Sequence, residues 1–351
     1  MNPIRQIHYR QIVRPMKTLF ATSLGRKSAA TSVLATVVLD DGTTGVGEAP
    51  TSFVLPHETA WSIKRILEEA REVFAGVPIE EYGQTLDAFR GRHGCFHMTL
   101  AGLEVALFRA LLAQRRTSEF AHWGARRGKL ETDITVPFIP AGDMLQRWLG
   151  RVMKVGFRTY KVKVSGKVEA DIRFVRRVRE ILSEGLEQFT IRLDGNQGYT
   201  AGSCLRMLDR LDSDGIAIEL FEQPLRKDDY AGLKRIRGRS AVPVILDETV
   251  FNADDCRRVI DEQLGDGVNI KIAKSGIAQS AAILKLAKAA GLKVMLGCMT
   301  ETMVGLSAGI YLAAGSGAFD FIDLDSIHLM AHRNRYGGIA IVGRHYVLKG
   351  A

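Results

Sequence analysis

The sequence predicts an α/β protein in which a smaller α+β domain precedes a (β/α) barrel. Between about residues 129 and 329, short apolar segments alternate with segments of helical periodicity, which is typical of parallel strands joined by crossover helices. Eight such strands within about 200 residues favour a closed barrel over an open sheet. The first 128 residues lack this alternation, so we expect a separate domain there.

The N-terminal region combines strands and helices. Residues 4–13 and 32–38 show strand patterning, and a turn after residue 38 leads into a further short strand. The connection between the first two strands, residues 16–30, is rich in small residues, and we expect a mobile loop. Apolar residues recur at spacings of three and four in residues 58–76 and 100–114, which predicts two helices.

The barrel strands are predicted from eight apolar segments. They are residues 134–138, 159–164, 189–194, 216–222, 242–248, 267–272, 292–297 and 319–325. Amphipathic helices are expected between most of them, for example at residues 169–185 and 279–291. The segment 337–350 is strand-like again, and we expect it to return to the N-terminal domain. The predicted domains are therefore 1–128 joined by the tail 330–351, and the barrel 129–329.

Composition argues against several classes of protein. No apolar run is long enough to span a membrane, and the first 15 residues lack the apolar segment of a signal peptide, so we expect a cytoplasmic protein. Cys95, Cys204, Cys256 and Cys298 form no CxxC pair, which argues against zinc and disulfides. The net charge of +9 is spread along the chain without the aromatic interleaving of a nucleic-acid surface. We expect a homo-oligomer that binds a small molecule, and neither nucleic acid nor membrane.

Two lysines stand in the predicted strand at 159–164, which reads TYKVKV. Alternate residues of a strand share a face, so Lys161 and Lys163 point to one side, and the tyrosine and the valines point to the other. An edge strand with solvent-facing lysines would explain this pattern without any function. A site that uses or neutralises both ammonium groups would explain it as well.

Charged residues occupy the C-terminal ends of almost all the predicted strands. Parallel strands in a barrel bring these ends to one mouth, where active sites are built. A single carboxylate at such an end is an ordinary helix cap, but capping does not explain a set of carboxylates between lysines. The set comprises Lys161, Lys163, Asp194, Glu222, Asp247, Glu248, Lys271, Asp323 and Asp325.

Three carboxylates from adjacent strands, Asp194, Glu222 and Asp247, form an all-oxygen donor set suited to Mg²⁺. Lysines on both flanks of this set fit proton removal beside a carboxylate, with the metal stabilising the enolate. A free lysine is protonated at neutral pH, and lowering its pKa by about three units requires about 4 kcal/mol. A second ammonium group and a nearby dication supply this energy, so we expect Lys161 to lower the pKa of Lys163.

Together these motifs resemble the enolase superfamily, and specifically its muconate lactonizing enzyme-like subgroup. The segments KVK, RLDGNQ, FEQP, LDE and NIKIAKSG are similar, in this order, to the first lysine motif, the three metal-ligand strands and the second lysine strand of that subgroup. The resemblance covers essentially the whole chain and implies an α+β capping domain on a modified TIM barrel of (β/α)7β type. It also implies one Mg²⁺ per subunit on Asp194, Glu222 and Asp247, with Lys163 and Lys271 as the two acid/base groups.

Residues next to the metal-ligand motifs have two interpretations each. Asn196 and Glu248 resemble partners of the metal ligands, and each is equally explained as a polar cap. The segment IDLD, with Asp323 and Asp325, resembles a DxD motif of dipeptide epimerases that receives the α-ammonium group of the substrate. Solvent-facing aspartates at a strand end are the alternative.

The resemblance also implies roles near the substrate. The segment GCMTE, residues 297–301, resembles the adjoining strand motif and places Cys298 beside the substrate and Glu301 behind it; a small barrel residue and a structural carboxylate are the alternatives. Arg26 stands in the segment where Ala–Glu epimerases carry an arginine for the glutamate side chain. It either binds an acidic side chain of the substrate or is solvated.

The function implied by the resemblance is that of a Mg²⁺-dependent dipeptide epimerase. Such an isomerase moves the α-proton of the C-terminal residue of a dipeptide through an enolate. The alternatives in the same subgroup are N-acylamino acid racemase, o-succinylbenzoate synthase and cycloisomerase, whose substrates lack a free ammonium group. A barrel that binds a carboxylate ligand without chemistry is a third hypothesis.

Overall fold

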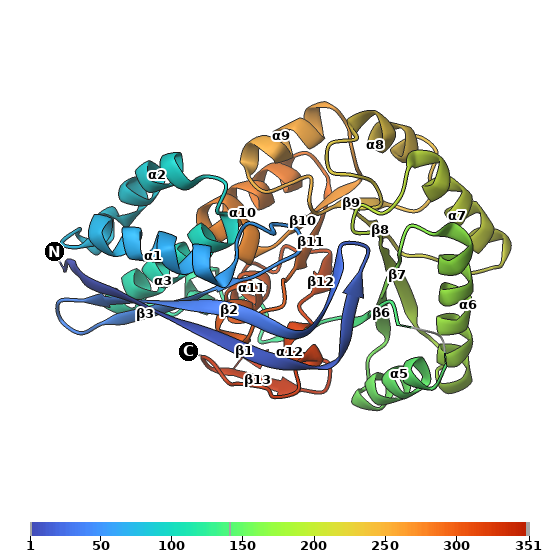
Figure 1. Ribbon diagram of the computed structural model, residues 1–351, viewed down its shortest axis with the longest axis horizontal. Coiled ribbons are helices and arrows are strands. Elements are labelled where there is room, and N and C mark those ends of the chain that lie inside the picture. The colour runs from blue at the N-terminus through green and yellow to red at the C-terminus, as the bar shows by residue number, and fades with distance from the viewer. Residues whose placement is uncertain (1, 140–141, 349–351) are drawn as a thin grey trace.

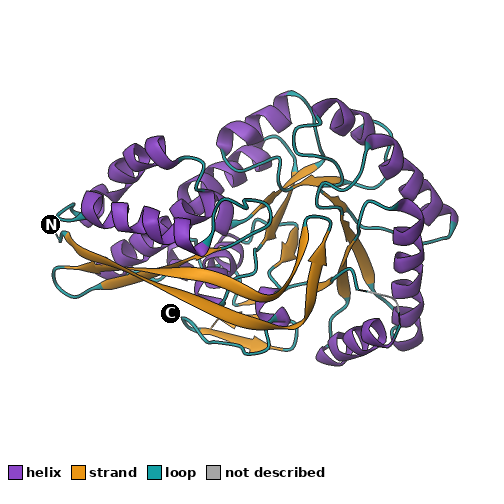
Figure 2. Cartoon of the chain, in the orientation of Figure 1, coloured by secondary structure: helices purple, strands orange, loops and turns teal. Residues whose placement is uncertain are grey.

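A computed structural model describes residues 2–139 and 142–348 of the chain. It confirms the predicted architecture, because a parallel barrel is accompanied by a separate antiparallel sheet covered by helices (Figures 1 and 2). Residues 1, 140–141 and 349–351, which fall within the predicted domain ranges, lie outside the described residues.

The N-terminal part is a three-stranded antiparallel sheet in the order β1-β2-β3, packed against helices. Side chains of the sheet and of the helices α1, α2 and α3 form one apolar cluster that includes Ile7, Val37, Ile66 and Leu103. The two predicted helices are confirmed as α1 and α3, whereas α2 buries too few apolar residues to show a periodic signal. The elements are β1 (Ile4–Thr22), β2 (Gly25–Leu39), β3 (Thr44–Pro50), α1 (Ala60–Phe74), the 3₁₀-helix η1 (Ile79–Glu81), α2 (Tyr82–His93), α3 (His97–Gln114) and α4 (Glu119–His122).

The predicted mobile loop at residues 16–30 is largely strand in the structure. β1 and β2 continue as one long hairpin, in which Phe20 pairs with Lys27 and Thr22 with Gly25. The loop prediction was wrong because each half of the segment is the pairing partner of the other, so small residues with little strand signal are held by the ladder. The tip of the hairpin reaches the barrel, where Ser23 Oγ donates to the backbone oxygen of Asn196 at 2.7 Å (Figure 1).

The barrel is an eight-stranded parallel sheet in the order β12-β11-β10-β9-β8-β7-β6-β5, which confirms all eight predicted strands. Hydrogen bonds at the ends of the two outer strands nearly close the barrel. Asp133 N donates to Ile322 O at 3.4 Å, and Leu324 N donates to Thr132 Oγ1 at 2.8 Å. The strands are β5 (Ile134–Val136), β6 (Thr159–Lys163), β7 (Thr190–Asp194), β8 (Phe221–Glu222), β9 (Val244–Leu246), β10 (Gly267–Ile270), β11 (Lys293–Gly297) and β12 (Phe321–Asp323).

Helices cover the outside of the barrel (Figure 2). They are α5 (Asp143–Val155), α6 (Val168–Gly185), α7 (Ala201–Ser213), α8 (Tyr230–Arg237), α9 (Ala253–Asp261), α10 (Ile272–Ala289) and α11 (Met303–Ser316). The short helix α12 (Ser326–Leu329) follows β12 and contacts β1 instead. Side-chain caps explain where some of them begin, since Thr200 and Asn252 each form a capping box at the start of α7 and α9. No helix among residues 2–139 and 142–348 combines the length and the apolar character needed to cross a membrane.

A third sheet joins the end of the described chain to the start of the barrel. β4 (Lys129–Glu131), β13 (Ile339–Val342) and β14 (His345–Leu348) pair in the order β13-β14-β4. The tail therefore pairs with β4 and also contacts β1, because Ala331 N donates to Pro15 O at 2.8 Å. The division into 1–128 with 330–351, and 129–329, stays a prediction.

A carboxylate of the N-terminal sheet joins the two parts of the molecule at the barrel mouth. Glu48 of β3 is buried and accepts hydrogen bonds from the backbone nitrogens of Thr302 and Gly305, each at 3.0 Å. These nitrogens belong to the first turn of α11, whose amides have no partner within the helix. The N-terminal sheet thus fixes the loop that precedes α11.

Glycines allow β3 and α3 to approach closely. A Cβ atom on Gly47 would lie 1.9 Å from the backbone oxygen of Gly102, and one on Gly102 would lie 2.8 Å from the backbone nitrogen of Ala49. Because backbone atoms occupy these positions, a larger residue would force the helix away from the sheet.

The variant Gly47→Ala is therefore expected to lower the free energy of unfolding by about 1–3 kcal/mol, measured by urea denaturation. Gly83→Ala on α2 is the matched control, since no described heavy atom lies within 4 Å of its added Cβ. The control is expected to leave stability unchanged or to raise it by up to about 1 kcal/mol. Equal effects of the two substitutions would contradict the close packing of β3 on α3.

Candidate active site

The two lysines of β6 point into the barrel. β6 pairs with β5 on one side and with β7 on the other, so the edge-strand explanation is wrong. Lys161 and Lys163 are only 3% and 5% exposed, whereas Tyr160 and Val162 belong to the apolar cluster of the barrel. Alternation along the strand therefore places both ammonium groups inside the barrel.

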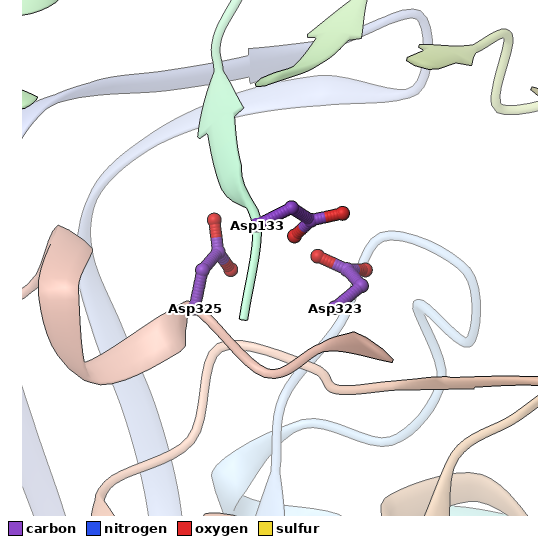
Figure 3. Close-up of side chains that lie close together, drawn as sticks. All are labelled: Asp133, Asp323 and Asp325. Atoms are coloured by element: carbon purple, nitrogen blue, oxygen red, sulfur yellow. The ribbon is translucent and has the colours of Figure 1, made fainter. Parts of the chain in front are cut away.

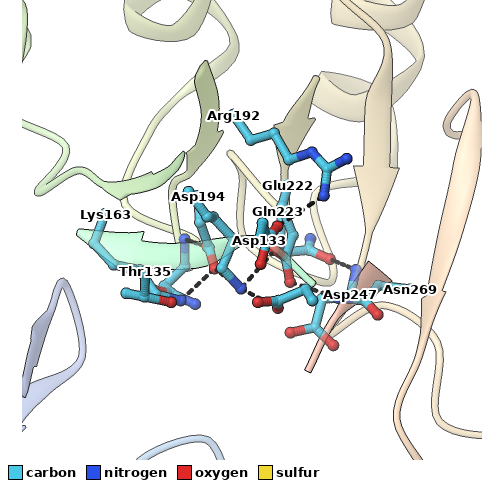
Figure 4. A network of polar contacts seen from close by, with 12 residues as sticks. Asp133, Thr135, Lys163, Arg192, Asp194, Glu222, Gln223, Asp247 and Asn269 are labelled. Atoms are coloured by element: carbon cyan, nitrogen blue, oxygen red, sulfur yellow. Dashed lines mark hydrogen bonds and ion pairs between the residues drawn. The ribbon is translucent and has the colours of Figure 1, made fainter. Parts of the chain in front are cut away.

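The ammonium groups of β6 contact carboxylates on the next two strands, and Figure 4 shows Lys163 beside Asp194 and Glu222. Lys163 is the register partner of Asp194, and Asp194 is the register partner of Glu222. The Lys163 ammonium group contacts Asp194 directly. Lys161 Nζ lies 3.3 Å from Glu222 Oε2 and 3.7 Å from Asp194 Oδ2, so it bridges the two carboxylates.

Two further lysines hold Asp247 at the end of β9. Lys271 Nζ lies 2.7 Å from Asp247 Oδ2 and 3.6 Å from Glu222 Oε1, and Lys274 Nζ lies 2.6 Å from Asp247 Oδ1. Burial disfavours the ionised form of Asp247, but the two ammonium groups outweigh it and hold its pKa below the usual range. Burial likewise opposes the charge on Lys271, yet Asp247 and Glu222 raise its pKa well above the ordinary value.

Lys163 and Lys271 come from opposite sides of the barrel. Their strands, β6 and β10, are separated by β7, β8 and β9, and four steps around eight strands lead to the far side. Both lysines line one cavity of about 630 Å³, including its opening, at the C-terminal ends of the strands. The three predicted metal ligands follow the intervening strands, which places them between the two amines.

The predicted metal ligands fit a divalent cation by charge and by chemistry. An ammonium group bridges each neighbouring pair: Lys161 bridges Asp194 and Glu222, and Lys271 bridges Glu222 and Asp247. Positive charge is thus already accommodated between these oxygens, which are the ligand type that Mg²⁺ prefers. In the described chain, two adjacent buried oxygens, Asn196 Oδ1 and Glu248 Oε2, have no hydrogen-bond partner. The assignment of the three ligands stays a prediction.

A different acidic group has the closest oxygens. Asp133, Asp323 and Asp325 are buried, and each offers an oxygen within 4.8 Å of the others (Figure 3). Lys161 pairs with Asp323, and Arg192 Nη1 lies 2.7 Å from Asp133 Oδ2. Burial, together with the charge of Asp323, raises the pKa of Asp133 well above its usual range and that of Asp325 to about 6. Asp323 and Asp325 line the cavity, so their carboxyl oxygens can accept a cationic group of a ligand.

The surroundings of Lys161 change the expectation that it lowers the pKa of Lys163. Burial opposes the charge on Lys161, but Asp323, Glu222 and Asp194 outweigh burial and raise its pKa well above the ordinary value. These carboxylates also offset the field that the Lys161 charge exerts on Lys163. Lys161 can therefore act on Lys163 as predicted only if a bound cation pairs with these carboxylates in place of Lys161.

Asn196 and Glu248 lie beside the metal-ligand row. Asn196 N donates to Asp194 Oδ1 at 2.9 Å, and its Nδ2 donates to Glu248 Oε1 at 3.4 Å. The φ angle of Asn196 is 40°, a left-handed conformation that asparagine tolerates better than most residues. Burial, and then the charge of Asp247, raise the pKa of Glu248 to about 8.

Other predicted residues are distributed around the cavity. Cys298 lines it together with Asp323 and Asp325. Glu301 is buried and accepts from Met299 N at 2.8 Å, and burial, followed by the charge of Glu48, raises its pKa to about 8. Arg26 is exposed on the hairpin and lines an adjacent recess instead of this cavity.

Several polar residues of the site were not predicted. Asn269 Nδ2 donates to Glu222 Oε1 at 2.7 Å, and Gln223 Oε1 accepts from Asp247 N at 2.9 Å. Asn269 stands two residues before Lys271 and thus on the same strand face, which is a signal that the sequence does contain.

Asp133 directly precedes the first barrel strand. Lys274 follows Lys271 by three residues, and a break at Gly276 (φ 75°) separates the turn that carries it from the rest of α10.

Comparisons with known proteins identify the family of the chain and confirm its fold. Residues 143–347 match the family described as enolase C-terminal domain-like. The L-Ala-D/L-Glu epimerase of Thermotoga maritima is 32% identical over 311 residues, which is 89% of this chain and 88% of that protein. A substrate-liganded complex of the L-Ala-D/L-Glu epimerase from Bacillus subtilis superimposes with a TM-score of 0.90 at 28% identity, covering 99% of this chain and 97% of the other. The dipeptide epimerase of Enterococcus faecalis complexed with Mg and L-Leu-L-Tyr has a TM-score of 0.90 at 26% identity, covering 99% and 98%.

The buried ion pair beside the acidic cluster is expected to be important for stability. Arg192→Met would leave Asp133 buried without its partner, so we expect the free energy of unfolding to fall by about 3–5 kcal/mol in urea denaturation. Arg226→Met is the control, because it removes an ion pair with Asp228 whose side chains are 74% and 57% exposed. The control is expected to lose less than about 1 kcal/mol. A loss as small for Arg192→Met would show that Asp133 does not require this cation.

Proposed function

The chain belongs to the enolase C-terminal domain-like family, and from this premise we propose that it is a Mg²⁺-dependent dipeptide epimerase. The observation that carries the proposal is the placement of two buried amines, Lys163 and Lys271, on opposite sides of one cavity. An epimerase needs one group on each face of the α-carbon, because the proton leaves from one face and returns to the other.

The two lysines would move the proton of the C-terminal residue. Lys163 takes the α-proton from one face, and Lys271 returns a proton to the opposite face, with the reverse assignment for the other epimer. The charge that develops on the substrate is spread over its carboxylate as an enolate. Because both amines are buried, the α-proton passes directly between the substrate and a lysine and not to bulk water.

Asp194, Glu222 and Asp247 would hold the Mg²⁺, with Asn196 and Glu248 beside them. Bound there, the metal would supply positive charge that stabilises the enolate and would draw the carboxylates away from the lysines. In its absence, Asp247 and Glu222 raise the pKa of Lys271 well above the ordinary value, which makes this amine a poor base.

The acidic cluster distinguishes this reaction from its rivals. A dipeptide carries a free α-ammonium group, and Asp323 and Asp325 line the cavity as carboxyl acceptors for such a group. The substrates of N-acylamino acid racemase, o-succinylbenzoate synthase and cycloisomerase lack this group, so the cluster favours a dipeptide. One Mg²⁺ per subunit, a cytoplasmic location and a homo-oligomeric assembly stay predictions.

Substitution of either amine tests the two-base assignment. Lys163→Ala and Lys271→Ala are each expected to lower epimerisation at least about 1000-fold, because one face of the α-carbon loses its acid/base group. The measurement is mass-spectrometric deuterium uptake in D₂O with Mg²⁺, on separate L,L and L,D dipeptides. Each variant is expected to exchange the α-proton of one epimer only, and EDTA is expected to stop exchange in the parent protein.

Lys167→Ala is the control for this experiment, because Lys167 is exposed at the start of α6. It is expected to leave epimerisation unchanged. Full turnover by both Lys163→Ala and Lys271→Ala would rule out the mechanism.

Asp325→Asn tests the ammonium subsite. The asparagine oxygen can still accept the hydrogen bond that Thr135 N donates to Asp325 Oδ2 at 2.6 Å, so the fold is retained while one negative charge is lost. We expect kcat/KM for L-Ala-L-Ala to fall about 10- to 100-fold, because a charge-assisted contact to the ammonium group is weakened. The residual rate on the N-acetylated dipeptide is expected to stay constant. Equal losses on both substrates would favour the rival reactions of the family.

A further inference from the structure

Asp133 and Asp323 lie side by side where the barrel closes. Asp133 directly precedes β5, and Asp323 ends β12, which are the two outer strands of the parallel sheet. Hydrogen bonds between these strand ends fix both residues. Asp133 N donates to Ile322 O at 3.4 Å, and Leu324 N donates to Thr132 Oγ1 at 2.8 Å. Figure 3 shows the two carboxyl groups facing each other.

Each of these carboxyl groups has one oxygen paired with a cation and one oxygen without a partner. Asp133 Oδ2 accepts from Arg192 Nη1 at 2.7 Å, and Asp323 Oδ2 pairs with Lys161. In the described part of the chain, Asp133 Oδ1 and Asp323 Oδ1 have no hydrogen-bond partner, although the residues are only 2% and 1% exposed. Burial of an unpartnered oxygen is costly. One hydrogen atom between the two acids would satisfy both oxygens.

The electrostatic surroundings favour such a hydrogen atom. Burial, followed by the charge of Asp323, raises the pKa of Asp133 well above its usual range, and Asp325 acts in the same direction. Arg192 and Lys161 oppose this change in pKa but do not cancel it. A protonated carboxyl group is a donor, and the carboxylate beside it is an acceptor. The titratable and charged groups that act on the pair are Lys161, Arg192 with its partner Glu219, Asp325, Lys271, Cys298 and Tyr346.

Only one member of the pair reaches the active-site cavity. Asp323 lines the cavity together with Asp325, whereas Asp133 lies behind Asp323 and outside this lining. Any effect of Asp133 on a ligand therefore passes through Asp323. Asp325 has a comparable support, because Thr135 N donates to its Oδ2 at 2.6 Å. A donor on Asp133 would give Asp323 the same kind of fixed orientation.

We propose that Asp133 and Asp323 share one proton through their Oδ1 atoms, and that Asp133 thereby positions the Asp323 carboxylate to receive the α-ammonium group of the substrate. The pair then carries one negative charge, with Arg192 at one end and Lys161 at the other. The positioning role rests on the proposed epimerase function, whereas the shared proton does not. Asp133 is a positioning residue and not a catalytic one, because it does not line the cavity.

The variant Asp133→Asn tests the shared proton, because the asparagine oxygen can accept from Arg192 while its nitrogen donates to Asp323. A group whose pKa is raised by folding stabilises the protein at low pH, and this stabilisation is lost as the pH rises. Between about pH 5 and pH 7, unfolding of the parent protein would release a proton that the variant does not carry. The unfolding equilibrium constant of the parent, divided by that of Asp133→Asn, is therefore expected to rise about tenfold per pH unit.

Urea denaturation of the Mg²⁺-loaded proteins across this pH range measures the ratio. Asp228→Asn is the matched control, because a hydrogen bond from Arg226 holds the pKa of Asp228 below its usual value, so this acid stays ionised throughout. Its ratio is expected to be constant. The infrared spectrum of the parent at neutral pH is expected to contain a C=O band of a protonated carboxyl group that is absent from Asp133→Asn. A constant ratio for Asp133→Asn, no loss of this band, or failure of Asp133→Asn to fold would each overturn the shared proton.

Activity on two substrates tests the positioning role. Asp133→Leu removes the donor, so kcat/KM for L-Ala-L-Ala is expected to fall about 10- to 100-fold, whereas Asp133→Asn is expected to stay within about twofold of the parent. The residual rate on the N-acetylated dipeptide is expected to stay constant in both variants. Equal losses on both substrates in Asp133→Leu, or a large loss in Asp133→Asn, would overturn the role. If Asp133→Leu does not fold, Asp133→Asn decides alone, because the preference for the free dipeptide is either kept or lost.

Failure of the proposed function is distinguishable from failure of this inference. Deuterium uptake into L-Ala-L-Ala in D₂O by the parent protein reports the epimerase reaction itself. Uptake together with a constant unfolding ratio would overturn the shared proton and leave the epimerase proposal intact. A rising ratio without uptake into any dipeptide would support the shared proton and overturn both the epimerase proposal and the positioning role.

Discussion

Lys161 and Lys271 each lie between two carboxylates inside the barrel, and the site depends on this mutual neutralisation of buried charge. Glu222 is shared by both lysines, while Asp194 and Asp247 take one further ammonium group each. A single charge at these positions would be costly to bury, but the alternating row satisfies every member. Removal of one partner would therefore leave buried, uncompensated charge on its neighbours. The strands from β6 to β10 are thus coupled electrostatically as well as by backbone pairing.

The same row of lysines and carboxylates indicates how a metal and a substrate would replace ion pairs inside the barrel. A dication on Asp194, Glu222 and Asp247 would compete with Lys161 and Lys271 for these carboxylates, which would leave Lys271 available to the α-carbon. At the opposite wall, Asp133, Asp323 and Asp325 lie together, with Lys161 paired to Asp323 and Arg192 to Asp133. The α-ammonium group of a dipeptide would be bound there by Asp323 and Asp325, which line the cavity. The cavity thus has a position for each charge of the proposed substrate.

The residues that line the cavity come from two parts of the chain. The barrel supplies the amines and acids, whereas the β1–β2 hairpin supplies Phe20 and Lys27 to the wall of the cavity. Two contacts hold the N-terminal part in place over the barrel mouth: Glu48 caps α11, and Ser23 reaches the backbone oxygen of Asn196. The wall of the cavity is therefore built from both the hairpin and the barrel, and these two contacts hold the hairpin against it.

Local patterns in the sequence determined the eight barrel strands, the inward direction of Lys161 and Lys163, and the charged residues at the strand ends, because side-chain alternation is a property of the strand itself. They also identified Asp194, Glu222 and Asp247 as one group, because parallel strands end at a common mouth. Only the tertiary structure decided that residues 16–30 form a hairpin, that Asp133 joins Asp323 and Asp325, and that Lys27 enters the cavity while Arg26 does not. Lys161 and Asp323 are 162 residues apart, and Lys27 and Thr300 are 273 residues apart. Contacts of this kind arise from the packing of distant segments, for which neither residue carries a local signal.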